Sequence, residues 1–284
     1  MTILDGKQTG NDIKAELTAR VDQLVKDGKR PPHLAAVLVG NDGASLTYVG
    51  SKVRSCERIG YESTLIQLPE ETTELELLQQ IDRLNANVAI DGFIVQLPLP
   101  KHIDEEKVLM AIDPRKDVDG FHPTNFGKMA LDMESFIPAT PHGIMELLHR
   151  YDIDISGKHA VVIGRSHIVG RPMSILLSRK SSPGNATVTL THSRTKNLAA
   201  ITKEADIVIS ALGVPNFLKE DMVKETAIII DVGITRVPDA SHPKGYIITD
   251  KVSFITPVPG GVGPMTIAML LQNTYLAYSR HADV

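Results

Sequence analysis

Four polar side chains in the first 120 residues have types and spacing suited to proton transfer and to binding a planar heterocycle: Tyr48, Lys52, Gln96 and Asp119. Tyr48 and Lys52 are four residues apart, so they share one face of the helix that apolar spacing predicts over 46–59. Lysine acts as an acid or base near neutrality only where burial or a neighbouring cation lowers its pKa. The pair therefore indicates either a reactive pocket or an ordinary polar helix surface.

Gln96 and an acidic turn extend this candidate site. Gln96 follows the apolar run 92–95, and open α/β sheets bind their ligands where the strands end, so its amide could orient a lysine there. Asp117-Val118-Asp119-Gly120-Phe121 then supplies two carboxylates in a predicted turn. These carboxylates fit either an Asx turn or a pair of acceptors for the N–H groups of a heterocycle.

A glycine turn in the second half of the chain predicts a nucleotide site. Gly164, Arg165 and Ser166 stand between a buried strand and a helix predicted over 168–179, where free N–H groups and the helix dipole attract a pyrophosphate. Compared with G-x-G-x-x-G, Ser166 replaces the second glycine, and Gly170 comes one residue late. A plain strand-turn-helix connection therefore remains the alternative.

The next strand indicates which nucleotide binds. It leads into Thr191-His192-Ser193-Arg194-Thr195-Lys196, which offers hydroxyls and cations where an NAD enzyme places a carboxylate. Ser193 and Arg194, together with Arg165, therefore predict NADP, unless the loop is only a solvated charged segment. Small residues after two later strands, in the segments 210–213 and 231–234, let the backbone approach the dinucleotide, and Ile234 closes the second segment.

The elements that must position these residues alternate between helix and strand, which predicts a two-domain α/β fold with mostly parallel sheets. We expect a catalytic domain over 1–138, a Rossmann-like NADP-binding domain over 139–265, a cleft between them, and a helix over 266–284 that packs back on the first domain. Segment 98–141 has many turn formers and little periodicity, so it predicts functional loops and the domain crossing. Strands are expected at 34–39, 63–68, 92–96, 160–163, 186–190, 207–211 and 227–232, the first and the last four of them buried.

The composition narrows the class of protein. The chain has 284 residues, 42% of them hydrophobic, and a net charge of −4, which provides no field to gather nucleic acid or anionic lipid. A single cysteine, Cys56, excludes an internal disulfide, and no Cys/His spacing predicts a metal site. No stretch has the length of a membrane span. We therefore expect a cytoplasmic protein that has a small-molecule partner and binds neither nucleic acid nor a membrane.

Five motifs, in this order, resemble those of the bifunctional methylenetetrahydrofolate dehydrogenase/methenyltetrahydrofolate cyclohydrolase family. The resemblance covers nearly the whole chain. One departure is Ala139, where the family commonly has cysteine. The motifs are Tyr48-Val49-x-x-Lys52, Val95-Gln96-Leu97-Pro98-Leu99-Pro100, Lys116-Asp117-Val118-Asp119-Gly120, Gly164-Arg165-Ser166-x-x-Val169-Gly170 and Pro257-Val258-Pro259-Gly260-Gly261-Val262-Gly263-Pro264-Met265-Thr266.

The resemblance implies hydride transfer from 5,10-methylenetetrahydrofolate to NADP, followed by hydrolysis of the methenyl product to 10-formyltetrahydrofolate. It also implies a homodimer and tetrahydrofolate derivatives as substrates. Lys52 would be the central catalytic group, Tyr48 would align the folate, Gln96 would hold Lys52, and Asp119 would bind the pterin. Arg165 and Ser193 would hold the 2′-phosphate.

Two other classes of function fit the same nucleotide half. One is another NADP-dependent two-domain dehydrogenase, such as a shikimate or amino-acid dehydrogenase, and the other is a non-catalytic nucleotide sensor or scaffold. The first domain discriminates between them, because only the folate enzyme requires Tyr48, Lys52, Gln96 and Asp119 to come together.

Overall fold

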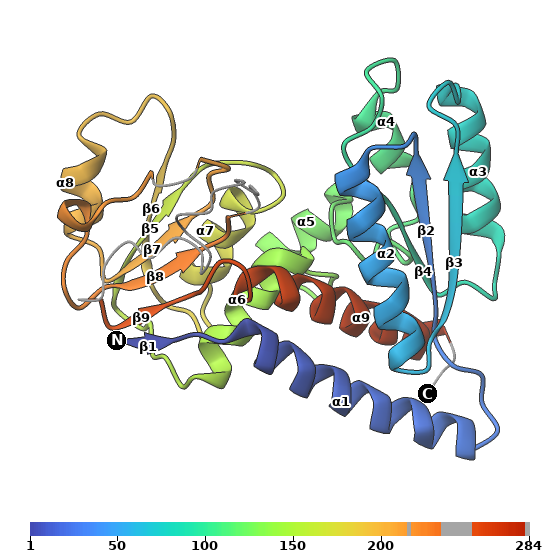
Figure 1. The fold of residues 1–284 in the computed structure, drawn as a ribbon, viewed down its shortest axis with the longest axis horizontal. Coiled ribbons are helices and arrows are strands. Elements are labelled where there is room, and N and C mark those ends of the chain that lie inside the picture. Colours follow the sequence, from blue (N-terminus) through green and yellow to red (C-terminus); the bar gives the residue numbers. More distant parts are fainter. Residues whose placement is uncertain (215–216, 234–251, 282–284) are drawn as a thin grey trace. The chain divides into compact units, whose positions relative to one another are not determined.

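The computed structural model describes residues 1–214, 217–233 and 252–281, and the chain divides into two compact units (Figure 1). One unit contains residues 1–11 and 140–269, and the other contains 12–139 and 270–284. Two long helices, α1 (Gly6–Lys26) and α9 (Val262–His281), contribute residues to both units. The predicted domain limits differ from this division mainly in that the N-terminal residues join the second half of the chain.

The unit formed mainly by the second half of the chain has a six-stranded parallel sheet in the order β1-β9-β8-β7-β5-β6. Chain order reverses at β5, whose two neighbours β6 and β7 follow it in sequence, so the switch point of this doubly wound sheet lies between β5 and β7. The strands are β1 (Thr2–Ile3), β5 (His159–Ile163), β6 (Thr187–Thr191), β7 (Ile207–Ser210), β8 (Ile228–Asp231) and β9 (Phe254–Ile255). The helices are α6 (Ala139–Arg150), α7 (Gly170–Ser178), α8 (Leu198–Lys203) and the 3₁₀ turn η1 (Glu220–Met222).

The other unit has a three-stranded parallel sheet in the order β3-β2-β4. Every residue of its central strand from Leu34 onward is buried, as expected for a parallel strand covered on both faces. The strands are β2 (His33–Val39), β3 (Glu62–Leu68) and β4 (Gly92–Val95), and the helices between and after them are α2 (Gly43–Arg58), α3 (Glu74–Ala86), α4 (Glu105–Ala111) and α5 (Pro123–Ala130).

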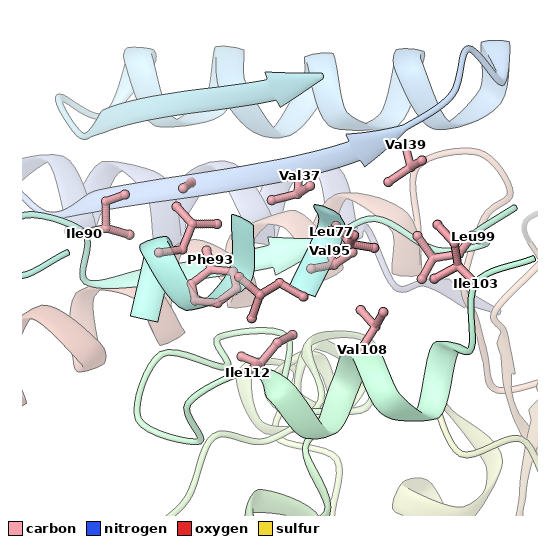
Figure 2. Packing of buried hydrophobic residues seen from close by; sticks show 13 residues of the cluster. Val37, Val39, Leu77, Ile90, Phe93, Val95, Leu99, Ile103, Val108 and Ile112 are labelled. Atoms are coloured by element: carbon pink, nitrogen blue, oxygen red, sulfur yellow. The ribbon is translucent and has the colours of Figure 1, made fainter. Parts of the chain in front are cut away.

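One side of this sheet packs on α3 and α4 through a continuous apolar cluster (Figure 2). Phe93 lies at its centre and is fully buried, together with side chains from all these elements. The cluster holds β4 in place, and the residue that follows β4 is one of the predicted site residues. Its labelled members are Val37, Val39, Leu77, Ile90, Phe93, Val95, Leu99, Ile103, Val108 and Ile112.

Both sheets use the same polar contacts at the start of one inner strand, β2 in one sheet and β5 in the other. His33 begins β2 and donates its backbone N–H to Asp91, while its ring bonds Thr64 on the adjacent strand. His159 begins β5, donates its backbone N–H to Asp206, and bonds Thr189 in the same manner. Each aspartate also pairs with a cation, Arg30 in the first case and Lys224 in the second. The amino-terminal edge of each sheet is therefore fixed, and the carboxyl-terminal edge carries the loops.

The structure confirms the predicted α/β class, the mostly parallel sheets and the positions of the seven predicted strands to within one or two residues. The prediction that 186–190 is a buried strand was wrong, because β6 lies at the edge of its sheet and its residues 187–190 are exposed or half-buried. The prediction of loops throughout 98–141 was wrong, because this segment contains α4 and α5. Both helices are short and are started by side-chain caps from Asp104 and His122, which a search for apolar periodicity does not detect. The two-residue strands β1 and β9 also escaped detection.

Candidate active site

Lys52 lies in the middle of α2 and is the centre of a buried polar cluster in the 12–139 unit. The helix begins at Asp42, whose carboxylate accepts the N–H of Ser45 at 2.8 Å. Lys52 is only 4% exposed, and its Nζ donates to Oε1 of Gln96 at 3.3 Å. The same Nζ lies 4.5 Å from the centre of the Tyr48 ring, so the two residues share one face of the helix, as predicted.

Gln96 is fixed on both its backbone and its side chain. Its backbone N–H donates to the carbonyl of Val37 at 2.8 Å, which extends the pairing of β4 with β2 by one residue. Its Nε2 donates to the carbonyl of Leu97 at 2.6 Å. Because the amide nitrogen is used there, the amide oxygen is the atom that faces Lys52. The prediction that an amide at this strand end would orient the lysine is consistent with this geometry.

Asp119 comes from a loop that is attached to the end of the sheet. Phe93 donates its N–H to the carbonyl of Lys116, and Phe93 and Asp117 form an isolated parallel bridge. Gly120 has φ +75°, and a Cβ there would lie 2.7 Å from the nitrogen of Pro138, so the loop presses closely on the following segment. This packing holds Asp119 within electrostatic reach of Lys52 and Tyr48.

The three ionisable groups of the cluster are each shifted towards their neutral form. Burial lowers the pKa of Lys52, although the charge of Asp119 partly opposes this. Burial raises the pKa of Asp119, and Lys52 partly opposes this as well. Burial and the charge of Asp119 both raise the pKa of Tyr48. The low polarity of the site therefore brings an amine and a carboxyl closer to exchanging a proton than either would be in water.

Asp117 and Asp119 have different surroundings, so each relates to a different one of the two interpretations that the sequence left open. The carboxylate of Asp117, 2% exposed, accepts the backbone N–H groups of Phe121 and His122, four and five residues on, so it closes a wider turn than the predicted Asx turn. Burial raises the pKa of Asp117 to about 7. Asp119 is the carboxyl that lies near the lysine and remains the candidate acceptor for a heterocycle.

The predicted nucleotide turn lies at the switch point of the six-stranded sheet. Gly164 follows β5 directly and has φ +109°, and a Cβ there would approach the carbonyl oxygen of Ala211, after β7, to 2.7 Å. Gly170 begins α7, and a Cβ there would collide with the carbonyl of Gly164. Both positions therefore require glycine, which brings the backbone close together where doubly wound sheets bind their ligands.

Ser166 explains how the turn works without the second glycine of the usual fingerprint. Its Oγ accepts the N–H groups of Val169 and Gly170 at 3.1 and 3.3 Å, so it fixes the turn that leads into α7. A hydroxyl that accepts two N–H groups can still donate its own proton outward to an anion. Ser166 and the adjacent Arg165 are both exposed, as a ligand-binding turn requires.

Ser193 and Arg194 emerge beside this turn. Ile163 and Thr191 are in register at the ends of β5 and β6, and Gly164 donates its N–H to the carbonyl of Thr191. The turn after β6 is closed by hydrogen bonds between His192 and Thr195, which leaves Ser193 and Arg194 exposed at its tip. Ser193 and Arg194, which the sequence predicts to favour NADP over NAD, therefore follow a strand at the same edge of the sheet as Arg165.

The segment 231–234, which the sequence predicts to approach the dinucleotide, is only partly described by the structure. Ile234 lies outside the described residues. Asp231, at the end of β8, accepts the N–H of Gly233 and exchanges hydrogen bonds with Thr256. Across the described ranges, no group of three or more His, Cys, Asp and Glu side chains could hold a metal ion. No helix among the same residues is both long and apolar enough to cross a bilayer.

A doubly wound sheet with a close-packed glycine turn at its switch point is typical of a nucleotide-binding α/β protein, and the other unit carries a buried lysine with polar neighbours. Two family descriptions match the chain and agree with this class. Residues 4–119 match the catalytic domain of tetrahydrofolate dehydrogenase/cyclohydrolase, and residues 138–282 match its NAD(P)-binding domain. The chain belongs to the tetrahydrofolate dehydrogenase/cyclohydrolase family.

Full-length relatives agree with this assignment. The bifunctional protein FolD of Flavobacterium johnsoniae is 70% identical, over 98% of this chain and 97% of its own length. The crystal structure of the bifunctional FolD enzyme of Campylobacter jejuni is 47% identical, covers 99% of both chains and has a TM-score of 0.92. The Trypanosoma brucei enzyme, solved with NADP and an inhibitor, is 36% identical, covers 100% of this chain and 99% of its own, and has a TM-score of 0.90. The predictions of family, enzyme class and NADP as cofactor are confirmed.

The steric argument at the nucleotide turn leads to a testable substitution. Gly170→Ala should lower the stability of its unit by about 1–3 kcal/mol, because the added methyl group collides with backbone rather than with a flexible side chain. Gly127→Ala in α5 is the matched control, because nothing lies within 4 Å of the position that a Cβ would take there, and alanine favours the helix by up to about 1 kcal/mol. Calorimetry of both variants measures the difference, and equal melting temperatures would contradict the close approach.

Proposed function

We propose that the Lys52 cluster is the reaction centre for both activities of this bifunctional methylenetetrahydrofolate dehydrogenase and methenyltetrahydrofolate cyclohydrolase. One observation carries the proposal. The Nζ of Lys52 is buried, donates to Gln96, lies over the Tyr48 ring and interacts with Asp119. No other lysine in the described part of the chain combines burial, an aromatic face and an acidic neighbour in this way.

For the cofactor, the exposed turn after β5 and the turn after β6 provide a suitable set of donors. NADP, when bound, accepts the hydride that leaves the methylene carbon of the folate. Ser166 would donate to the pyrophosphate beside the N-terminus of α7, where the helix dipole favours an anion. Arg165, Ser193 and Arg194 would hold the 2′-phosphate. The guanidinium groups would pair with its negative charge, and the hydroxyl would donate a hydrogen bond to one of its oxygens.

Hydrolysis follows from the chemistry of Lys52. The methenyl product is already a cation, so water can add to it once a base removes a proton from that water. The lowered pKa of Lys52 makes the neutral amine available for this role, and Gln96 holds the amine in place. When the carbon–nitrogen bond of the adduct breaks, the ammonium can return the proton to the departing ring nitrogen, while the hydroxyl hydrogen of the adduct leaves to solvent as the formyl C=O forms, so one proton is released overall. No metal is needed for either step.

Tyr48 and Asp119 would bind the substrate. The ring of Tyr48 presents a planar face for the folate beside the lysine, and Asp119 would accept the N–H groups of the pterin. Binding of the methenyl cation is also favoured by the ionised form of Asp119. A bound cation would therefore lower the pKa of Asp119. It would also lower the pKa of Lys52, because like charges repel.

The direct test of this function mixes the full chain with NADP and 5,10-methylenetetrahydrofolate, and follows the absorbance of reduced cofactor and of the methenyl product. We expect reduced cofactor to accumulate while the methenyl species remains low, because it is hydrolysed. A chain that binds NADP without turnover would support the sensor or scaffold alternative and contradict the proposal.

Replacing the central lysine should separate binding from chemistry. Lys52→Met retains much of the side chain's apolar volume but removes the amine, so cyclohydrolase activity should fall by at least about 100-fold, the size of a general base contribution. NADP affinity should stay unchanged. Lys101→Met, at an exposed lysine after the β4 loop, is the control and should keep full activity. Normal hydrolysis of the methenyl substrate by Lys52→Met would remove Lys52 from the mechanism.

The choice of nucleotide tests the turn after β5. Arg165→Ala should raise the Kd for NADP by about 10-fold or more and leave the Kd for NAD nearly unchanged, because only NADP carries the 2′-phosphate. Lys180→Ala, at an exposed position beyond the other end of α7, controls for a general loss of positive charge. Titration calorimetry with both nucleotides measures this, and equal weakening of NAD and NADP would refute the role of Arg165.

We also propose that the chain acts as a cytoplasmic homodimer. β3 is paired only with β2 in the described sheet, so its outer edge is free, and Leu65 on this strand is 43% exposed. An open edge strand with an exposed apolar side chain favours pairing with a second copy. Sedimentation of the full chain should give twice the mass of one 30.9 kDa chain.

A further inference from the structure

The carboxylate of Asp117 has an environment that the proposed chemistry does not use. It accepts three hydrogen bonds, from the N–H of Phe121 at 3.2 Å, the N–H of His122 at 2.8 Å and Nδ2 of Asn125 at 2.9 Å. None of these three donors carries a charge. Asn125 is itself buried and also donates to the carbonyl of Pro114, so its amide cannot turn away without losing a second bond.

These hydrogen bonds close a short loop around Asp119. Asp117 is anchored to the sheet through its bridge with Phe93, and its carboxylate holds the backbone at residues 121 and 122. Asp119 lies between the two ends of this closure. The backbone carbonyl of Val118 is held in addition by Nδ2 of Asn273. Displacement of the 121–122 backbone would therefore move Asp119 relative to Lys52.

We propose that Asp117 is a positioning residue of the reaction centre, whose ionised carboxylate fixes the 117–122 loop so that Asp119 faces Lys52. This inference rests on the proposed function only in that Asp119 binds the substrate. Asp117 itself need not touch the substrate. When it is ionised, both of its oxygens are acceptors and all three donors are satisfied. When it is protonated, one oxygen carries a hydrogen, and at least one of the three bonds weakens.

The carboxyl of Asp117 changes its protonation state within the pH range in which the enzyme is assayed. Burial, helped by the charge of Asp119, raises the pKa of Asp117 to about 7 even though the bonds from Asn125, His122 and Phe121 act in the opposite direction. The fixed loop is therefore complete above about pH 7 and is lost as the pH falls through that value. Substrate capture should decline on the same acid side.

The neighbouring charges are accounted for by other contacts. Before Asp117, the Lys116 ammonium donates to the carbonyls of Leu84 and Asn87, and Asp113 pairs with Arg115. From the α5 side, the Nδ1 atom of His122 accepts the N–H of Thr124, and burial lowers the pKa of His122. From the sheet, β4 contributes the uncharged Phe93. Asp119 is thus the charged neighbour whose state is coupled to Asp117.

Three variants of the full chain test this. Asp117→Asn removes the titrating carboxyl and keeps its size, Asn125→Ala removes one donor and keeps the carboxyl, and Asp113→Asn removes a nearby carboxyl outside the closure. For each, kcat and KM for 5,10-methylenetetrahydrofolate are measured from about pH 5 to 9 in the dehydrogenase reaction. NADP affinity is measured in parallel. The nucleotide turn belongs to the other unit, so an unchanged affinity shows that the substitution has not disrupted that unit.

In the wild-type chain and in Asp113→Asn, we expect kcat/KM for the folate to fall below about pH 7. In Asp117→Asn the fall of kcat/KM near pH 7 should disappear from the pH profile. Above that pH its kcat/KM should be about 10-fold lower than in the wild-type chain, mainly because KM rises. In Asn125→Ala the limb should move to higher pH by about one unit, because the lost bond had favoured the ionised form.

A loss that is equal at every pH in both variants would show a purely structural role and overturn the inference. An unshifted limb in Asn125→Ala would do the same, even if Asp117→Asn failed to fold. Absence of turnover in the wild-type chain would instead reject the proposed function, so the two failures are distinguishable.

Discussion

The withdrawal of the Lys52 ammonium from water is the constraint around which this part of the molecule is organised. A buried cation is costly unless polar groups replace its hydration. Gln96 supplies an oxygen, the Tyr48 ring supplies a negative face, and Asp119 supplies a charge. None of these fully compensates for burial, so the pKa of Lys52 stays lowered. The neutral amine of Lys52 is therefore easier to form than that of a lysine in water.

Each group near Lys52 depends in turn on the sheet. Gln96 is held because its backbone continues the ladder between β4 and β2, and the Asp119 loop is held because Phe93 binds Lys116 and Asp117. The nucleotide turn follows the same principle in the other unit, since Gly164 is bound to the end of β6. Parallel strands place their carboxyl ends at one edge, so loops far apart in sequence are brought together there. The histidine and aspartate contacts secure the opposite edge of each sheet.

The sequence predicted the parts of this arrangement that depend on local pattern. Continuous apolar runs identified buried strands such as β2, β5 and β7, the four-residue spacing placed Tyr48 and Lys52 on one helix face, and the strand end identified Gln96. The same pattern overestimated the burial of β6, because the sequence does not show which strand lies at the sheet edge. The different environments of Asp117 and Asp119 could not be predicted, because they depend on which carboxyl the distant Asn125 reaches. Helices α4 and α5 were missed because side-chain caps, not periodic apolar faces, define them. Strands β1 and β9 are only two residues long and are defined by pairing between distant segments, β9 with β8 and β1 with β9, which a local pattern does not show.

The central claim, that burial lowers the pKa of Lys52 against the opposing charge of Asp119, can be measured without turnover. Carbon-13 labelling of the lysine Cε positions allows each ammonium to be titrated by NMR, with Lys52→Arg assigning the Lys52 resonance. The account predicts a pKa below the ordinary lysine value of 10.5 in the free protein, and a still lower pKa in Asp119→Asn, because the Asp119 charge opposes the effect of burial. A Lys52 that titrates at or above its ordinary value, or that is unaffected by the loss of Asp119, would contradict it.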